Sequence, residues 1–200
     1  DNGKERLLPF VREADFGIAD VKVDKESIKA GEIFVGLHLP LLEPSSPAAL
    51  PMVAKVTFSH KSSKLKEPIG IDIADESNGT QALFRTAGAW LNVFSNGEVL
   101  LVDEIDSSLH PLLVRFLIEK FHSRSTNPRS AQLIFTTHNT SLLSQELFRR
   151  DQIWFVEKDA DNASRCYPLS DFGPRKDEVI ERWYMRGRYG ALPILSEIAM

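Results

Sequence analysis

The sequence contains a single cysteine, Cys166, so no disulfide can form within the chain, and a reducing compartment fits best. It has no run of 18 apolar residues and no signal-peptide pattern, which argues against a membrane partner. The formal net charge is −4, so no overall basic field attracts nucleic acid, although a local basic patch stays open. We therefore expect a cytoplasmic protein.

The rest of the composition is that of an ordinary globular protein. Hydrophobic residues make up 42% of the chain and charged residues 26%. A length of 200 residues suits one domain, or slightly more, with a sizeable core. The sequence begins at Asp1 rather than Met, so we expect a fragment or a processed form of a longer protein.

We divide the chain into residues 1–74, a region of strands and loops, and residues 75–200, a second lobe. Hydrophobic periodicity and turn residues define the elements of the first region. They predict a short amphipathic helix at 7–18, a strand at 20–28, a proline-rich linker or insertion at 40–51, a strand at 53–59, a basic loop at 60–68 and a returning hairpin strand at 69–73.

In the second lobe, helices and strands are predicted to alternate. The predicted elements are a helix at 81–94 that ends at Asn96-Gly97, a strand at 99–102, a helix at 112–121, a strand at 132–137, a helix at 141–147 and a strand at 153–156. Strands that alternate with helices form a parallel sheet through right-handed crossovers. The fold class is therefore α/β, a parallel sheet with flanking helices, plus a small antiparallel hairpin region.

Two acidic residues directly follow the first strand of this lobe, in Val99-Leu-Leu-Val-Asp-Glu-Ile-Asp106. The apolar run predicts a strand buried on both faces, and ligands of open α/β sheets bind at the carboxyl ends of such strands. Asp103 and Glu104 would then be placed to hold Mg²⁺ and to orient a water beside a nucleotide phosphate, as in a Walker B strand. The alternative is a core strand that ends in a solvated acid pair.

Three further features lie at helix starts or strand ends. In Asp75–Gln81, hydroxyl groups and a glycine precede a helix, as in an anion site, and the alternative is an ordinary N-capped helix. In Thr136-Thr-His138-Asn139, a neutral histidine could contact a γ-phosphate and its attacking water, and the alternative is an ordinary histidine. Asp106–Pro111 starts the next helix, and the alternative there is a plain cap.

Taken together and in this order, these features resemble the second half of an ABC-type ATPase head, as in SMC-like and OLD-like ATPases. The sequence is most similar to bacterial AAA-family ATP-binding proteins of the OLD-like group, which includes anti-phage defence ATPases. The similarity extends to segments beyond the motifs, among them Leu8–Ile18, Val56–His60, Asp151–Lys158 and Gly187–Pro193. The resemblance implies a P-loop NTPase-like fold. This chain would supply its C-terminal lobe at 75–200, and residues 1–74 would be the remnant of an insertion and of the N-terminal lobe.

The resemblance also implies a role for each matching residue. Asp103 would bind Mg²⁺, Glu104 would polarise the attacking water, and His138 would be the switch histidine that senses the γ-phosphate. The signature motif, which contacts the nucleotide of the opposite subunit, would comprise Ser77, Gly79, Thr80 and Gln81. The loop that crosses the dimer interface would run from Asp106 to His110, with His110 where many such heads have Asp.

The implied function is ATP hydrolysis with Mg²⁺ by a homodimer that sandwiches two ATP molecules. It would drive an effector or nuclease partner protein, or act on nucleic acid. No Gly-x-x-x-x-Gly-Lys-Ser/Thr loop occurs in the 200 residues, so we expect this chain alone to be inactive and to belong to a longer ATPase. The alternative is a non-catalytic regulatory module that keeps the motifs. An intrinsic nuclease would need an acidic cluster outside them, and the sequence offers none.

Other chemistry-bearing residues have mostly structural interpretations. Trp90, Trp154 and Trp183 are expected in a core or an interface. Lys61, Lys64 and Lys66 form a solvated loop that could also contact phosphate. A basic–aromatic patch near the C-terminus favours a structural or partner role over nucleic-acid binding, and it comprises Arg182, Tyr184, Arg186, Arg188 and Tyr189.

Overall fold

The computed structural model describes residues 2–14, 17–27, 52–62 and 67–193. The chain forms two compact units, Asp1–Thr136 and Thr137–Met200, and each is described by itself. The predicted boundary between residues 74 and 75 is not tested by this division and stays a prediction. Within the described ranges, no helix is long and apolar enough to span a membrane.

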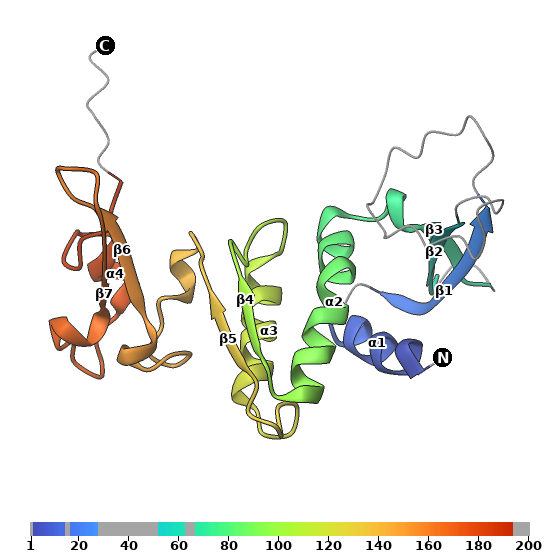
Figure 1. Ribbon diagram of the computed structural model, residues 1–200, viewed down its shortest axis with the longest axis horizontal. Coiled ribbons are helices and arrows are strands. Elements are labelled where there is room, and N and C mark those ends of the chain that lie inside the picture. The colour runs from blue at the N-terminus through green and yellow to red at the C-terminus, as the bar shows by residue number, and fades with distance from the viewer. Residues whose placement is uncertain (1, 15–16, 28–51, 63–66, 194–200) are drawn as a thin grey trace, which may run out of the picture. The chain divides into compact units, whose positions relative to one another are not determined.

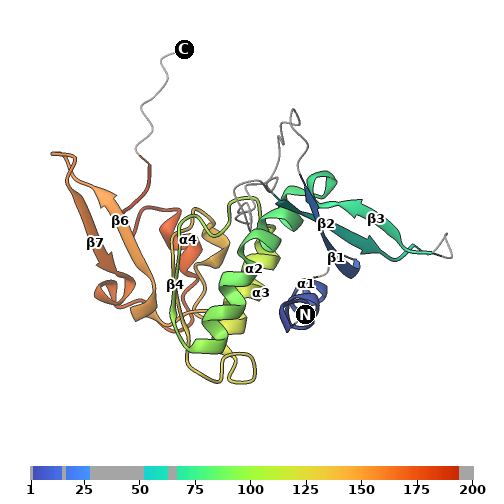
Figure 2. The same cartoon turned by 45° about the vertical axis from the view of Figure 1, so that its right-hand side comes forward.

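An antiparallel sheet opens the first unit. It consists of β1 (Ile18–Ser27), β2 (Met52–His60) and β3 (Ile69–Asp72), with β2 in the middle (Figure 2). Val23 pairs with Val56 across β1 and β2, and Phe58 pairs with Ile71 across β2 and β3. The two strands predicted at 20–28 and 53–59 and the returning hairpin strand predicted at 69–73 are confirmed. The predicted linker at 40–51 and the lysines Lys64 and Lys66 lie outside the described residues.

Helix α1 (Asn2–Glu13) starts earlier and ends earlier than the predicted helix at 7–18. Its polar first turns have no apolar periodicity, but Arg6 fixes them because its Nη2 donates a hydrogen bond to the Leu91 carbonyl oxygen at 2.5 Å. Ile18 belongs to β1 instead of to the helix. Tertiary contacts therefore set both ends of α1, and periodicity alone could not find them.

Helix α2 (Asn78–Asn96) begins three residues before the predicted start at Gln81 because Ser77 caps it. The Ser77 Oγ accepts a hydrogen bond from the Thr80 backbone nitrogen at 3.1 Å. The predicted end at Asn96-Gly97 is confirmed, since Gly97 adopts a left-handed conformation with φ 73°. A Cβ at Gly97 would lie 2.5 Å from the Arg129 carbonyl oxygen, so the position needs glycine for space as well.

The second sheet of this unit is a parallel pair, β4 (Val99–Val102) and β5 (Gln132–Phe135), joined through α3 (Pro111–His122). Figure 1 shows the two strands side by side. The predicted parallel strand–helix–strand is thus confirmed. The apolar faces of α2 and α3 meet beside it, where Trp90 is buried and packs edge-on against Phe121 at 5.7 Å, as expected for a core tryptophan.

The prediction that these strands are buried on both faces is wrong for the described residues. Val99, Leu101 and Ile134 are 53%, 72% and 58% exposed, and they share one face because alternate strand residues point the same way. The helices cover only the opposite face. An apolar run predicts that a strand is buried in the complete sheet, but it does not identify the part of the protein that packs on each face.

The second unit is built on an antiparallel hairpin, β6 (Trp154–Lys158) and β7 (Ser164–Pro168). The strand predicted at 153–156 exists, but it pairs with β7 instead of joining the parallel pair. Around the hairpin lie the short 3₁₀ helices η2 (Thr140–Leu142), η3 (Arg150–Gln152) and η4 (Leu169–Phe172) and the helix α4 (Ile180–Tyr184).

The α-helix predicted at 141–147 is wrong, since only η2 forms there, followed by turns. Ser144 explains the difference. Its Oγ accepts from the Glu146 backbone nitrogen at 3.2 Å, and in a continuous helix that nitrogen would donate to the Leu142 carbonyl oxygen. Asn139 caps η2, since its Oδ1 accepts from the Ser141 backbone nitrogen at 3.1 Å.

The two tyrosines of the predicted basic–aromatic patch pack in the core of this unit, whereas Arg182, Arg186 and Arg188 are exposed. Phe155 stacks between Tyr184 and Tyr189, with ring centroids 5.5 and 5.7 Å away, and Tyr189 is fully buried. Arg188 pairs with Glu178 and lies over the Trp183 ring. The tyrosines are therefore unavailable as stacking platforms for bases. Trp154 is 56% exposed, so it is not a core residue, and the predicted interface position stays a prediction.

Candidate functional site

The two acids that follow β4 lie in a tight turn with an unusual backbone. Asp103 and Glu104 are exposed, and Glu104 has φ 48°, a left-handed conformation that costs a non-glycine residue roughly 1–2 kcal/mol. Ile105, only 3% exposed, anchors the turn in the core. The Glu104 carbonyl oxygen accepts from the Ser107 backbone nitrogen at 2.8 Å, which closes the turn. Such strain is characteristic of functional sites.

Thr136, directly after β5, holds this turn with its side chain and its backbone. Its Oγ1 accepts from the Glu104 backbone nitrogen at 2.8 Å and donates to the Asp103 Oδ1 at 2.5 Å. Its carbonyl oxygen accepts from the Ile105 backbone nitrogen at 3.0 Å, and its own nitrogen donates to the Val102 carbonyl oxygen at 3.0 Å. The sequence marks this strand end but assigns no role to Thr136. The sequence signal for this role was a hydroxyl residue at the end of the parallel strand that neighbours β4.

The chemistry of these donors fits Mg²⁺ bound together with a nucleotide. In NTPase sites Mg²⁺ keeps waters and takes one or two carboxylates plus phosphate oxygens, so a single fixed aspartate such as Asp103 is sufficient from the protein. Among the residues that the structure describes, no group of three or more His, Cys, Asp or Glu side chains could hold a metal without such help. Asp103 therefore fits a shared protein–nucleotide magnesium site and does not form a protein-only one.

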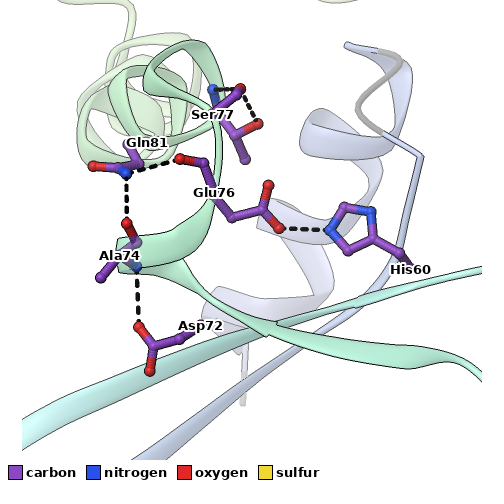
Figure 3. Close-up of polar contacts among 7 residues, drawn as sticks. His60, Asp72, Ala74, Glu76, Ser77 and Gln81 are labelled. Carbon is purple, nitrogen blue, oxygen red and sulfur yellow. Dashed lines mark hydrogen bonds and ion pairs between the residues drawn. The ribbon is translucent and has the colours of Figure 1, made fainter.

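The predicted signature residues lie at the start of α2, and several are committed to the local structure (Figure 3). The Gln81 Nε2 donates to the carbonyl oxygens of Ala74 at 3.3 Å and Glu76 at 2.9 Å. Thr80 is buried, with its Oγ1 2.9 Å from the Ser77 Oγ. Ser77 is exposed at the helix start, and Gly79 is half-buried beside it. The N-capped helix is thus confirmed, while contact with an anion stays a prediction.

The signature turn (Asp75–Gln81) leads into α2, and the acid turn (Asp103–Ser107) follows β4. The side chains of the two turns bind different neighbours, since the Ser77 Oγ accepts from the Thr80 backbone nitrogen and the Asp103 Oδ1 accepts from the Thr136 Oγ1. That the signature turn contacts the nucleotide of the opposite subunit stays a prediction.

The segment from Asp106 to His110 leads into α3, and His110 caps that helix. The His110 Nδ1 accepts from the Leu112 backbone nitrogen at 3.2 Å, and Pro111 occupies the first helical position. The helix-cap alternative is confirmed for His110. An aspartate side chain could accept the same hydrogen bond, so either histidine or aspartate can cap α3 at this position. Asp106 is half-buried, and its carbonyl oxygen accepts from the Leu109 backbone nitrogen at 3.3 Å.

His138 belongs to the second compact unit, two residues after Thr136. It is exposed. The turn that follows is fixed locally, because the Asn139 backbone nitrogen donates to the Thr137 Oγ1 at 3.0 Å. The switch role of His138 stays a prediction.

A comparison with protein families identifies the family of this chain. A family model described as "AAA domain, putative AbiEii toxin, Type IV TA system" matches residues 15–144, more than half of the chain. The match includes the signature turn, the acid turn and the segment with Thr136 and His138. No curated protein matches the chain. The chain therefore belongs to this AAA-domain family of P-loop, ATPase-type nucleotide-binding proteins.

Proposed function

We propose that this chain is the C-terminal part of an ABC-type, OLD-like ATPase that hydrolyses ATP as a head-to-tail homodimer. The observation that carries the proposal is the acid turn, in which Thr136 binds Asp103 and the Glu104 backbone together. Rigid support of this kind is what a carboxylate needs to hold a water in line with a phosphorus atom.

In this proposal, each acid has one task. Asp103 would hold Mg²⁺, which neutralises the phosphate charge when it is bound. Glu104 would orient the attacking water and accept its proton while the bond to the leaving ADP breaks. His138, from the segment after β5, would contact the γ-phosphate oxygens. Asp106 would lie at the dimer interface.

The resemblance supports the dimer, because the signature motif of such heads contacts the nucleotide of the opposite subunit. Ser77 is exposed at the start of α2, so it is available for such a contact. In a two-fold dimer, each subunit would then supply the acid turn of one site and the signature turn of the other.

The exposed face of the parallel pair indicates that another part of the protein packs on it. Parallel sheets are almost always covered on both faces, whereas Val99, Leu101 and Ile134 are exposed. We propose that the lobe with the phosphate-binding loop covers this face. The partner would be an effector or nuclease protein, or a nucleic acid, and the defence role rests on the resemblance alone.

The test is Mg²⁺-dependent ATP turnover by the longer protein that contains this chain and its phosphate-binding loop. We expect Asp103→Asn to lower turnover at least about a hundredfold, because it removes the charge on the metal ligand. Asp171→Asn, a matched change at an exposed aspartate of η4, should leave turnover unchanged. Equal turnover in wild type and Asp103→Asn would overturn the proposal. So would tight MgATP binding, measured by calorimetry, to the 200-residue chain alone.

A further inference from the structure

A hydrogen-bonded histidine–carboxylate pair joins the three-stranded sheet to the turn before α2. His60 is the last residue of β2, and its Nε2 lies 2.5 Å from the Glu76 Oε1 (Figure 3). The side chains of His60 and Glu76 are only 21% and 7% exposed. Such a contact between a strand end and a loop carboxylate is independent of the cap at Ser77 and of the acid turn.

Glu76 is tied to the signature turn on its other side as well. It immediately precedes Ser77, the N-cap of α2, and its carbonyl oxygen accepts from the Gln81 Nε2 at 2.9 Å. Its backbone nitrogen donates to the Ile73 carbonyl oxygen at 3.3 Å. The Glu76 backbone therefore belongs to the same hydrogen-bonded turn as Ser77.

An apolar contact also joins β2 to α2. Phe58 of β2 is fully buried and meets Phe84 of α2 edge-on, with ring centroids 5.2 Å apart. This contact already holds the sheet against the helix, so burial of a carboxylate is not needed for adhesion. A buried carboxylate is costly unless it is paired, and breaking such a pair leaves an uncompensated charge.

The negative charge of Glu76 also affects how an anion could approach Ser77. An unpaired Glu76 carboxylate, one residue before the helix N-cap, would repel a phosphate that approaches Ser77 and would oppose the attraction of the helix N-terminus for anions. The hydrogen bond to His60 holds this carboxylate toward the end of β2 (Figure 3).

We infer that the His60–Glu76 pair is a positioning device, through which the three-stranded sheet sets the signature turn for the nucleotide of the opposite subunit. This inference rests on the proposed ATPase dimer. His60 and Glu76 are positioning residues, since they act through Ser77 and contact no reacting atom.

The experiment uses the longer ATPase in a Glu104→Gln background, which should accumulate an ATP-bound dimer because hydrolysis is blocked. We expect His60→Ala in this background to weaken ATP-dependent dimerisation at least about tenfold, measured by sedimentation. The affinity of the single subunit for MgATP should stay within about twofold, because the nucleotide is held by other residues. If His60 only stabilised the fold, His60→Ala would weaken dimerisation and MgATP binding to a similar extent.

Two further variants keep the test independent of folding. His60→Gln and Glu76→Gln each retain a side chain that can bind the other residue, so we expect both to dimerise within about threefold of the background. Lys22→Ala, which removes an exposed pair with Asp24 in the same sheet, is the matched control and should dimerise normally.

Each outcome bears on one of the two proposals. If Glu104→Gln alone forms no ATP-bound dimer, the proposed function fails. If Glu104→Gln dimerises and His60→Ala dimerises equally well, only the positioning role is overturned. The positioning role is also overturned if His60→Ala weakens MgATP binding as much as dimerisation.

Discussion

The hydroxyl group of Thr136 lies 2.5 Å from the Asp103 Oδ1 and 2.8 Å from the Glu104 backbone nitrogen. One side chain at the end of β5 thus fixes both acids at the end of β4. The parallel pairing of the two strands brings these residues together, since Val102 pairs with Phe135 and the next residues of each strand must meet. The sheet therefore builds the acid turn.

Thr136→Val removes this hydroxyl with little change of shape. We expect it to lower kcat about 10- to 100-fold, because Asp103 and Glu104 lose their common support, and to cost about 1 kcal/mol of folding stability. Thr136→Ser keeps the hydroxyl and should retain most of the activity. Steady-state ATPase assays and urea denaturation of the two variants check this. Equal kcat for Val and Ser would contradict the role of the hydroxyl group.

The left-handed backbone at Glu104 predicts a conflict between stability and activity. Glu104→Gly and Glu104→Ala both remove the carboxylate, but only glycine adopts φ 48° without strain. We expect the glycine variant to be more stable than the alanine variant by about 1 kcal/mol, and both to be inactive. Thermal unfolding of the matched pair measures the difference. If alanine is as stable as glycine, the turn is not strained.

Ser77 allows the cap to be separated from the proposed contact with phosphate. Ser77→Ala should destabilise the chain by about 1 kcal/mol, since the acceptor for the Thr80 nitrogen is lost. Ser77→Asp keeps an acceptor and should keep stability, but its charge would repel the phosphate, so ATP-dependent dimerisation should be lost. Denaturation and sedimentation are the measurements. A Ser77→Asp variant that still dimerises with ATP would rule out Ser77 as a nucleotide contact.

The second unit should lose stability in alkali. Burial, with smaller contributions from Glu157 and Glu178, raises the pKa of Tyr167 and Tyr189 to about 12. In the unfolded chain both phenols ionise near about pH 10, so the folded state retains protons that the unfolded state has lost. The stabilisation is complete below about pH 10 and declines as the pH rises to about 12. Tyr167→Phe should flatten this decline in urea titrations, and an unchanged slope would contradict it.

The sequence predicted the local elements that depend on near neighbours. The strands around Val23, Val56 and Leu100, the start of α3 at Pro111 and the end of α2 at Gly97 all follow from periodicity or turn chemistry. These features need no knowledge of the rest of the fold.

The sequence could not predict what depends on distant pairing. The strand around Phe155 reads as a buried parallel strand, yet β7 pairs with it from the other side of a tight turn. The turn at Ser144 has helical periodicity, but its side chains bind the backbone. Thr136 and the His60–Glu76 pair were missed as determinants of the site, because each joins segments that are separated in the sequence by 16 residues or more.

In the proposed mechanism, Glu104 activates the water that hydrolyses ATP between two subunits. Glu104→Gln preserves the size of the side chain and removes its charge, so the direct measurement is ATP turnover together with the mass of the complex in MgATP. We predict turnover at least about a hundredfold lower and a stable dimer that dissociates when ATP is removed. Unchanged turnover, or a monomer in saturating MgATP, would contradict this claim.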